Sequence, residues 1–547
     1  MAPAAGEWQK KECILPRLPD LFEKSDNKNI VFLNCSVEGR KMGNGSNSDY
    51  KKWNDYAGWL NPYSLLLLAA AFLFAASVNQ LSADNDTDIL WHYKIGEQIL
   101  ETHEITLKNT FTWIEGSTWN QQEWLFDVIL YFWVHTFGLA GYVVMNTIGM
   151  FFGLLICLHV SHTGQPVLFL FAFLVLHFCV RMCGRPGEYS VYFIVFFISL
   201  YGSEICRWRK LLYMALIGLF MANFHGGNIC AMLCMYGVML LTDFVLDQRD
   251  HSLKGKLYLL HLEELAVFAA ASCICPMGPG ILVNSILAAG SKTIPYIAEW
   301  MPYRMHFLEA LLFVFGILSL GYFLGQSHFE RNSTRNIALI AAFTVLTFIS
   351  YRNRVILLHL WLCFGAGLSM DMVYQLFRAK EEIIHFPGER IKKQIAIPTV
   401  MTVFVASILF TVWRIGKYRT FSSYGDRYCS PQILEILERE KGENVRILAP
   451  YVLSNSLLFH DIPVSFDSRE YPYDTKNITI LLEDFKTGEE DLSYSTDFVK
   501  KYDFDYVWTD KRTYRIELSM ERNENYEKVY EDLAEEQVLW KRKSAHT

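Results

Sequence analysis

The sequence predicts an α-helical polytopic membrane protein that carries a small soluble α/β domain at its C-terminal end. Three observations predict this class. The chain has 547 residues, of which 52% are hydrophobic and only 20% are charged, a mixture that suits a large membrane region with soluble attachments. Long apolar segments recur between residues 62 and 414. Beyond about residue 415 they stop, and short β-like runs at 445–450, 462–467 and 505–510 alternate with helix-like stretches such as 430–442 and 493–502.

The domain organisation follows this pattern. We expect a polar cytoplasmic tail over 1–58, a membrane region over 59–414 with an acidic first loop at 81–123, and the α/β domain over 415–547. The tail lacks the basic-then-apolar pattern of a signal peptide. The net charge of −7 gives no basis for nucleic-acid binding. Most of the twelve cysteines fall in apolar runs, which favours packing over disulfides or a zinc site.

The apolar segments predict about 11 or 13 spans, because an odd number reconciles the charges of the loops with the two ends of the membrane region. The segment 124–138 is the weak candidate, which we expect to run along or dip into the interface. The predicted segments lie near 62–80, 124–138, 139–160, 166–182, 186–202, 211–223, 228–246, 257–275, 306–325, 336–350, 354–376 and 394–414.

Loop charges predict the orientation. The N-terminal tail carries nine Lys or Arg residues, whereas the loop 81–123 carries two, Lys94 and Lys108. This asymmetry predicts a cytoplasmic N-terminus and an extracytoplasmic acidic loop. The loop 378–393 is also basic and therefore predicted to be cytoplasmic, which places the C-terminal domain outside.

The acidic loop is the first candidate for chemistry. Asp86 can cap a helix that begins at Thr87, and Asp88 then lies in its first turn, where the helix dipole favours acids. Asp88, Trp91 and His92 share one face of that helix. Two interpretations stay open: capping acids on an interfacial helix with Trp91 in the aromatic belt, or a general base beside a sugar-stacking aromatic.

Further polar residues stand at the ends of predicted spans on the same side. His225 follows Asn223 and precedes two glycines that allow close backbone approach. Glu299 and Trp300 form a second acid–aromatic pair. A lone histidine on an apolar helix usually serves packing, but Asn223 and the glycines favour a site, and a loop surface also explains these residues.

Three arginines also stand at span ends. Arg185, Arg352 and Arg354 can snorkel to the interface. Alternatively, their guanidinium groups can clamp a departing phosphate, which arginine suits by its planar geometry.

These residues belong to a series of short motifs. The segment Asp86–Gly96 reads DTDILWHYKIG, and further motifs are QQEWL at 121–125, Arg185-Pro186, ANFHG at 222–226, Pro276-Met-Gly278, Ala298-Glu299-Trp300 and IPVSFDSR at 462–469. In order, they resemble the motifs of a bacterial family of multi-span membrane proteins within the GT-C superfamily of glycosyltransferases. That superfamily includes protein O-mannosyltransferases and the lipid A aminoarabinose transferase. Asn455 and Ser456 stand where the family usually has two glycines.

The resemblance implies a GT-C-like membrane region, a sugar donor on a polyprenyl phosphate, an aspartate base in the first extracytoplasmic loop and a lipid cavity between spans. It implies Asp88 and Asp86 as candidate catalytic residues. The candidate substrate-binding residues are Trp91, His92, Glu123, Trp124, Arg185, Asn223, His225, Glu299, Trp300, Arg352 and Arg354.

The expected activity is inverting transfer of a sugar to an extracytoplasmic acceptor, in the cytoplasmic membrane of a bacterium. The expected partners are membrane lipid, the polyprenyl-phosphate sugar donor, and a glycan, lipid or protein acceptor, but no nucleic acid. No cofactor is certain, and the acids are compatible with a divalent metal. The alternatives are a transporter or flippase of lipid-linked saccharides, and a non-catalytic cell-surface assembly protein. We find no internal repeat, and the acids gather on one loop, which favours the enzyme.

Overall fold

An apolar helix bundle occupies the first part of the chain that the structure describes. The computed structural model describes residues 62–80, 87–113, 121–161, 166–180, 184–252, 255–283, 286, 301–302, 331–365, single positions between 402 and 413, and 420–442, 445–450, 452–469, 499–511 and 513–543. The tail Met1–Trp59 is a separate unit outside these residues.

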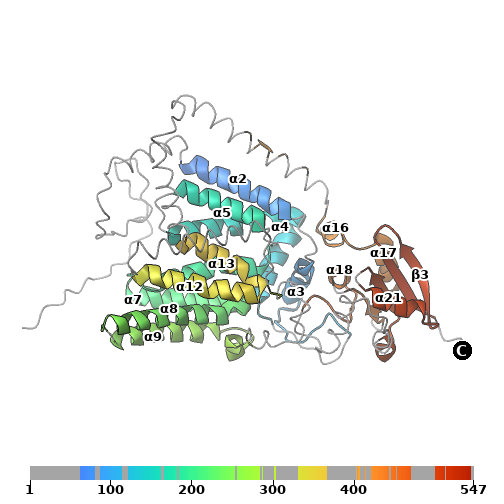
Figure 1. Cartoon of the computed structure of the whole chain (residues 1–547). Helices are drawn as coiled ribbons and strands as arrows, with labels where there is room; N and C mark the ends of the chain where they lie inside the picture. The colour runs from blue at the N-terminus through green and yellow to red at the C-terminus, as the bar shows by residue number, and fades with distance from the viewer. Residues whose placement is uncertain are drawn as a thin grey trace, which may run out of the picture. The chain divides into compact units, whose positions relative to one another are not determined.

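Nine α-helices form the described part of the bundle (Figure 1). They are α2 (Pro62–Gln80), α4 (Trp124–Ser161), α5 (Pro166–Val180), α6 (Pro186–Leu200), α7 (Arg207–Phe224), α8 (Ile229–Arg249), α9 (Gly255–Ser272), α12 (Arg331–Ile349) and α13 (Arg354–Leu360). Short turns accompany them: η2 (Gly226–Asn228), η3 (Gly278–Leu282), η6 (Tyr351–Asn353) and the π-helical η7 (Trp361–Gly365).

Three helical stretches among the described residues are long and apolar enough to cross a membrane: Trp124–Ser161, Gly226–Arg249 and Arg331–Ile349. Shorter apolar helices lie at Ala69–Val78 and Pro186–Leu200. The predicted class, a largely helical protein with apolar spans and a small C-terminal sheet, is confirmed. The count of 11 or 13 spans stays a prediction, because the segments 306–325 and most of 394–414 lie outside the described residues.

The helix α4 unites two segments that the sequence analysis separates. It continues from Trp124 to Ser161, but Gly138 has φ 61° and ψ −146°, a conformation that breaks the helix. Glycine tolerates positive φ without steric cost, so the chain bends at this residue. The boundary predicted between 138 and 139 therefore coincides with a kink at Gly138 that divides α4 into two helical segments.

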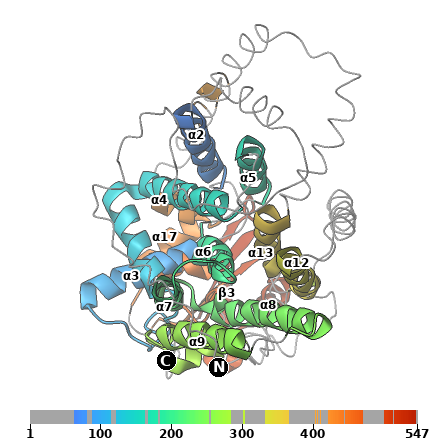
Figure 2. The same ribbon diagram turned by 90° about the vertical axis from the view of Figure 1, so that its left-hand side faces the viewer.

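The bundle has two chemically distinct ends. At one end α6 and α13 begin and α7, α9 and α12 finish; at the other, α6 and α8 finish and α7, α9 and α12 begin. Helix α7 packs on α9 and α8 on α12, side by side in both views (Figures 1 and 2). The first of these ends carries the candidate functional residues.

Helix α3 (Asp88–Thr102) connects the bundle with the C-terminal domain. It packs on α4 and on α18 (Ser454–Phe459). Its residues Trp91, Ile95 and Ile99 share a hydrophobic core with residues of the C-terminal domain. The predicted start of this helix is wrong by one residue: Thr87 is the N-cap, and the helix begins at Asp88.

The C-terminal domain contains a four-stranded sheet with strand order β1-β2-β4-β3. Strand β1 is parallel to β2, and the pairs β2–β4 and β4–β3 are antiparallel. Its elements are α16 (Phe421–Gly425), α17 (Pro431–Glu440), β1 (Ile447–Leu448), α18, β2 (Tyr506–Asp510), α21 (Tyr514–Glu521), β3 (Tyr526–Asp532) and β4 (Gln537–Arg542).

The runs at 445–450 and 505–510 contain β1 and β2 as predicted, and the predicted helix near 430–442 is α17. The run IPVSFD at 462–467 forms no named strand. Val464 instead makes isolated parallel bridges to Thr112 and Ile447. Pro463 has no N–H to donate to a β-ladder, so strand pairing in this run is limited to Val464. The hairpin β3–β4 escapes prediction because β3, YEKVYED, is mostly exposed and lacks an alternation of apolar and polar residues.

Candidate functional site

The carboxylate of Asp88 is held from two sides at the start of α3. Arg185 Nη1 donates to Asp88 Oδ2 over 2.9 Å. Ser468 Oγ donates to Asp88 Oδ1 over 2.5 Å. The two members of the ion pair are partly exposed, Asp88 by 22% and Arg185 by 27% of the side chain. The pair therefore combines a fixed geometry with access from solution.

The local sequence fixes the position of Arg185. Gly184 adopts φ 73°, in the left-handed region that glycine prefers, and its N–H donates to Glu188 Oε2 over 2.7 Å. Arg185 is extended and caps α6, and Pro186 at the first helical position presets the helical φ. This turn directs the guanidinium group of Arg185 to Asp88.

A hydrogen-bond network ties the N-terminus of α3 to the C-terminal domain. Thr87 Oγ1 donates to the Val452 carbonyl over 2.9 Å. Asn455 Nδ2 donates to Thr87 Oγ1 over 2.9 Å and to Ser468 Oγ over 2.7 Å. The side chain of Asn455 is fully buried, so these bonds are shielded from water. The network orients both Asp88 and the residue that hydrogen-bonds it.

Next to Ser468 lies a buried ion pair. Arg469 Nη2 lies 2.5 Å from Asp467 Oδ2 and also donates to Asn109 Oδ1 over 3.0 Å. Both charged side chains are buried. An ion pair is stable in such a place only when its remaining N–H donors and oxygen acceptors also have hydrogen-bond partners. The pair anchors the loop after α3 to the segment that carries Ser468.

His92 lies one turn along α3 from Asp88 and is buried. Its Nδ1 is 2.5 Å from Asp127 Oδ1, and its Nε2 is 3.9 Å from Glu123 Oε2. Burial, together with the positive charge of Arg185, holds the pKa of His92 well below its usual value. Burial therefore disfavours the imidazolium form of His92, and a hydrogen bond joins its Nδ1 to Asp127 Oδ1.

Trp91 stacks on His92 with ring centroids 3.6 Å apart and is only 6% exposed. Both of these features are typical of a core residue. The geometry favours a packing role over the sugar-stacking role that the sequence suggests.

Glu123 and His225 meet beside this group. His225 Nε2 lies 3.2 Å from Glu123 Oε1. Arg352 Nη2 donates towards the same nitrogen over 3.4 Å. A Cβ placed on Gly187 would lie 3.2 Å from His225 Nε2 and 3.7 Å from Arg352 Nη2, so glycine leaves room for both side chains. Arg352, which is exposed, is thus a second cation at the same end of the bundle as Arg185.

Trp124 and Asn223 pair with each other. Trp124 Nε1 donates to Asn223 Oδ1 over 2.7 Å, and Asn223 Nδ2 donates to the carbonyls of Leu219 and Ile274. The pair locks the start of α4 to the end of α7. Arg354 places its guanidinium group 3.9 Å from the ring centroid of Tyr351 in a cation–π contact.

The structure thus brings Asp88, Arg185 and the group of His92, Glu123, His225 and Arg352 to one end of the bundle. Asp86, Glu299 and Trp300 lie outside the described residues. No group of three His, Cys, Asp or Glu side chains in the described residues could hold a metal ion.

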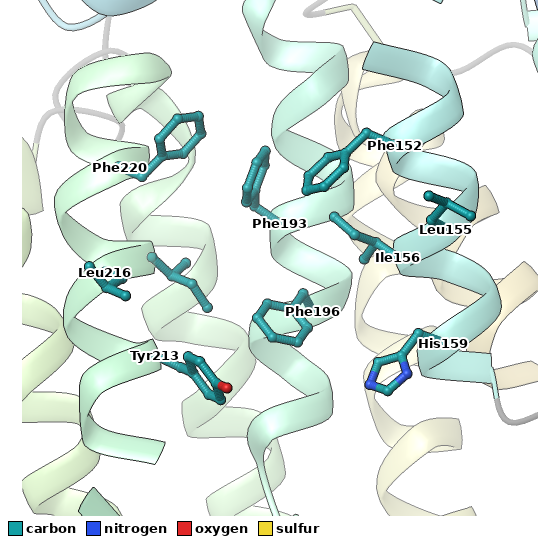
Figure 3. Close-up of a pocket in the computed structure, with 10 residues that line it drawn as sticks. Phe152, Leu155, Ile156, His159, Phe193, Phe196, Tyr213, Leu216 and Phe220 are labelled. Carbon is teal, nitrogen blue, oxygen red and sulfur yellow. The ribbon is translucent and has the colours of Figure 1, made fainter. Parts of the chain in front are cut away.

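An apolar cavity of about 450 Å³ opens between α4, α6 and α7. Figure 3 shows its side chains in tiers, with Phe152, Phe193 and Phe220 in one and His159, Phe196 and Tyr213 in another. Aromatic contacts connect this cavity with the polar group: His92 contacts Phe126, Phe126 contacts Phe224, and Phe224 stacks on Phe220 at a centroid distance of 4.8 Å.

Three residues of this arrangement were not predicted as site residues. Ser468 and Asn455 lie in the C-terminal domain, and nothing in their spacing relates them to α3. Asp127 is an acid in an otherwise apolar stretch, and its backbone N–H donates to the carbonyl of Glu123, the residue before α4. That isolated acid is the signal that would have identified it.

The bundle and the C-terminal domain together resemble, in fold, two solved structures of an archaeal oligosaccharyltransferase. One similar solved structure is the oligosaccharyltransferase AglB of the archaeon Archaeoglobus fulgidus in complex with an inhibitory peptide and a dolichol-phosphate (TM-score 0.50, 11% identity, 84% of this chain and 70% of that chain). Another is an A. fulgidus oligosaccharyltransferase tethered to an acceptor peptide that contains the NVT sequon (TM-score 0.51, 12% identity, 83% and 70%). At such identities the likeness concerns the fold alone. No family model and no curated protein sequence matches the chain.

Proposed function

We propose that the protein is a membrane glycosyltransferase that moves a sugar from a polyprenyl-phosphate donor to an acceptor nucleophile. The observation that carries the proposal is the partly exposed ion pair of Asp88 and Arg185 at the junction of an apolar bundle and a polar domain. Such transfer needs a base for the acceptor and a cation for the departing phosphate within a few ångströms of each other.

In the proposed reaction the acceptor hydroxyl or amine attacks the anomeric carbon, and its proton passes to the Asp88 carboxylate. The bond between the anomeric carbon and the phosphate oxygen breaks, and the electron pair leaves with the polyprenyl phosphate. Direct displacement inverts the anomeric configuration, through a transition state of oxocarbenium character. The transferred proton thus ends on the Asp88 carboxyl group, and the negative charge ends on the departing phosphate.

Arg185 has two roles in this scheme. Before the donor binds, it pairs with Asp88 Oδ2. A donor phosphate competes for the same guanidinium group, because arginine matches phosphate geometry with two N–H donors. Binding of the donor would then release Asp88 Oδ2 for the acceptor proton. Arg352, beside His225, supplies a second positive charge for the phosphate.

The apolar cavity supports a lipid-linked donor. Its aromatic walls suit an isoprenoid chain, and the aromatic contacts through Phe126, Phe224 and Phe220 lead from His92 towards it. The fold likeness to a protein solved with a dolichol-phosphate agrees with this class of ligand. We further propose that Asp86 assists Asp88, and that the site faces the extracytoplasmic side of a bacterial cytoplasmic membrane.

The test is sugar release or transfer from synthetic polyprenyl-phosphate sugars by purified protein, with wild type beside Asp88→Asn and Asp86→Asn. The matched control is Asp250→Asn, because Asp250 pairs with Arg249 over 2.8 Å at the far end of α8, about 30 Å from the site. We expect Asp88→Asn to abolish transfer and Asp250→Asn to retain it. Full activity in both Asp88→Asn and Asp86→Asn would refute the proposal. Silence of folded wild type across a broad donor panel would favour a transporter or an assembly protein.

A further inference from the structure

A second, polar pocket lies at the end of the bundle opposite the candidate site. It has a volume of about 500 Å³ and lies where α6 ends and where α7, α9 and α12 begin. Basic side chains from two helices line it: Arg207 and Lys210 from α7, and Arg331 and Arg335 from α12.

The charges around this pocket are layered. Asp243 accepts from Arg335 over 2.6 Å, and Asp247 pairs with Arg331. The side chains of Asp243 and Asp247 are only 1% and 3% exposed, whereas that of Arg331 is 34% exposed. On α7 and α9, Arg207 is 33% exposed and its partner Glu264 is 2% exposed. Asp243, Asp247 and Glu264 therefore lie beneath the bases, whereas Glu263, 52% exposed, pairs with Arg207 at the surface. An anion that approaches over Arg331 meets N–H donors first.

Lys210, whose side chain is 9% exposed, makes a long ion-pair contact in this layer. Its Nζ lies 3.6 Å from Glu264 Oε1, beyond hydrogen-bond distance. The carboxylate of Glu264 already accepts from Arg207 and Tyr236. An ammonium group has three donors, so an anion in the pocket would offer Lys210 a closer acceptor.

A glycine keeps one wall of the pocket open. Gly202 adopts φ 69° in the loop between α6 and α7. A Cβ built there would lie 2.9 Å from Arg335 Nη1. A larger residue would therefore crowd a guanidinium group that lines the pocket.

The other walls of the pocket are apolar. Leu257 and Leu260 of α9 line it beside the basic groups. Nearby, Trp208 of α7 is 47% exposed and Leu259 of α9 is 67% exposed. Exposed aromatic and apolar side chains of this kind are typical of a surface in a bilayer and its interface. A free inorganic anion makes no favourable contact with apolar walls, whereas a phospholipid presents a phosphate to the basic groups and acyl chains to the apolar side chains.

This pocket is distinct from the candidate site. Arg207 at the start of α7 lines it, and Phe224 at the other end of α7 adjoins His225. Eighteen residues of α-helix span about 27 Å, close to the thickness of the hydrocarbon core of a bilayer. The two sites thus lie at opposite ends of the bundle.

We propose that this pocket binds the phosphate headgroup of an anionic phospholipid from the leaflet at that end of the bundle. Basic pockets between membrane helices bind such headgroups by charge and hydrogen bonding. The proposal does not depend on the proposed glycosyl transfer, because it involves other residues and the other end of the bundle.

The test uses the full-length protein in nanodiscs of phosphatidylcholine, with or without phosphatidylglycerol, and counts retained lipids by native mass spectrometry. We expect wild type to retain phosphatidylglycerol in preference to phosphatidylcholine. Lys210→Gln should weaken this retention about fivefold, the effect of one basic residue near an anionic surface. Lys210→Arg should preserve it. Arg249→Gln, which removes an exposed charge at the same end of the bundle, should leave it unchanged.

Equal retention of the two lipids by wild type would overturn the proposal, and so would equal losses in Lys210→Gln and Arg249→Gln. Displacement of phosphatidylglycerol by an equal concentration of inorganic phosphate would identify a free-anion site and would also overturn it. If Lys210→Gln does not fold, the lipid preference of wild type and its loss at high salt decide the question, because salt screens headgroup binding.

Discussion

Ser468 donates its hydroxyl hydrogen to Asp88 across 2.5 Å, although 380 positions separate them in the sequence. Asn455 hydrogen-bonds both Ser468 and Thr87, the residue before Asp88. The C-terminal domain therefore completes the surroundings of the candidate base and does more than pack against the bundle. A substitution in this domain should thus alter the orientation of the Asp88 carboxylate.

We predict that Ser468→Ala lowers kcat for sugar transfer by about ten- to a hundredfold, since a hydrogen bond to a charged group is worth about 1.5–3 kcal/mol. KM for the donor should change little, because Ser468 is a positioning residue that acts through Asp88. Steady-state kinetics of the purified protein measure both constants. Ser468→Thr keeps the hydroxyl group and should recover most of the activity. Equal losses in both variants would contradict the positioning role.

Arg185 gives a second prediction. Arg185→Lys keeps the charge but loses the planar pair of donors, whereas Arg185→Gln loses the charge. We expect transfer to fall about tenfold in Arg185→Lys and at least a hundredfold in Arg185→Gln, the cost of losing one strong charge-assisted contact. Steady-state kinetics of the purified variants measure this order of activities. Equal activity of the two variants would mean that charge at this position does not matter for the phosphate.

Much of the site could be predicted because its residues lie at the ends of apolar segments. Arg185, His225 and Arg352 each follow or precede a helix of the bundle, and loop charges place them at one end. The contacts between these residues could not be predicted, because they depend on tertiary packing. The partnership of Asp88 and Ser468 joins two regions without any periodic relation. The sequence left two roles open for Trp91, in the aromatic belt or stacked on a sugar, and its burial against His92 favours packing.

Acid should destabilise the protein through His92. The pKa of His92 is lowered in the folded state, chiefly by burial, whereas the unfolded chain takes up a proton near its usual value of about 6.5. Below that pH the unfolded state binds more protons, so stability falls as the pH decreases, by up to about 1.4 kcal/mol per pH unit. Above about pH 7 this contribution to stability is complete.

The measurement is Tm at pH 7.5 and pH 5.5 for wild type and His92→Gln. We expect the decrease in Tm between these two conditions to be smaller in the variant. His135→Gln is the control, because His135 is exposed on α4 and lies outside the group of His92, Asp127 and Glu123. An unchanged pH dependence in His92→Gln would show that this imidazole is not the group that titrates on unfolding.

The close crossing of α3 and α4 gives the last prediction. A Cβ built on Gly96 overlaps the backbone carbonyl of Asp127 and lies 2.8 Å from Tyr131 Cβ. Backbone cannot rotate away as a flexible side chain can, so Gly96→Ala must separate the helices or tilt them. We expect a loss of about 1–3 kcal/mol in the free energy of unfolding. The displacement should also disturb the contact of His92 with Asp127, which is one turn of α3 away.

Gly237→Ala is the matched control for this change. Gly237 lies inside α8, and a Cβ there meets nothing within 4 Å. Alanine is favoured over glycine in a helix interior by about 1 kcal/mol, so this variant should be more stable than wild type. Thermal unfolding of both variants at one pH measures the opposite signs. Destabilisation in both would indicate that the bundle rejects any substitution of helical glycine, whereas the predicted difference would locate the constraint at the crossing of α3 and α4.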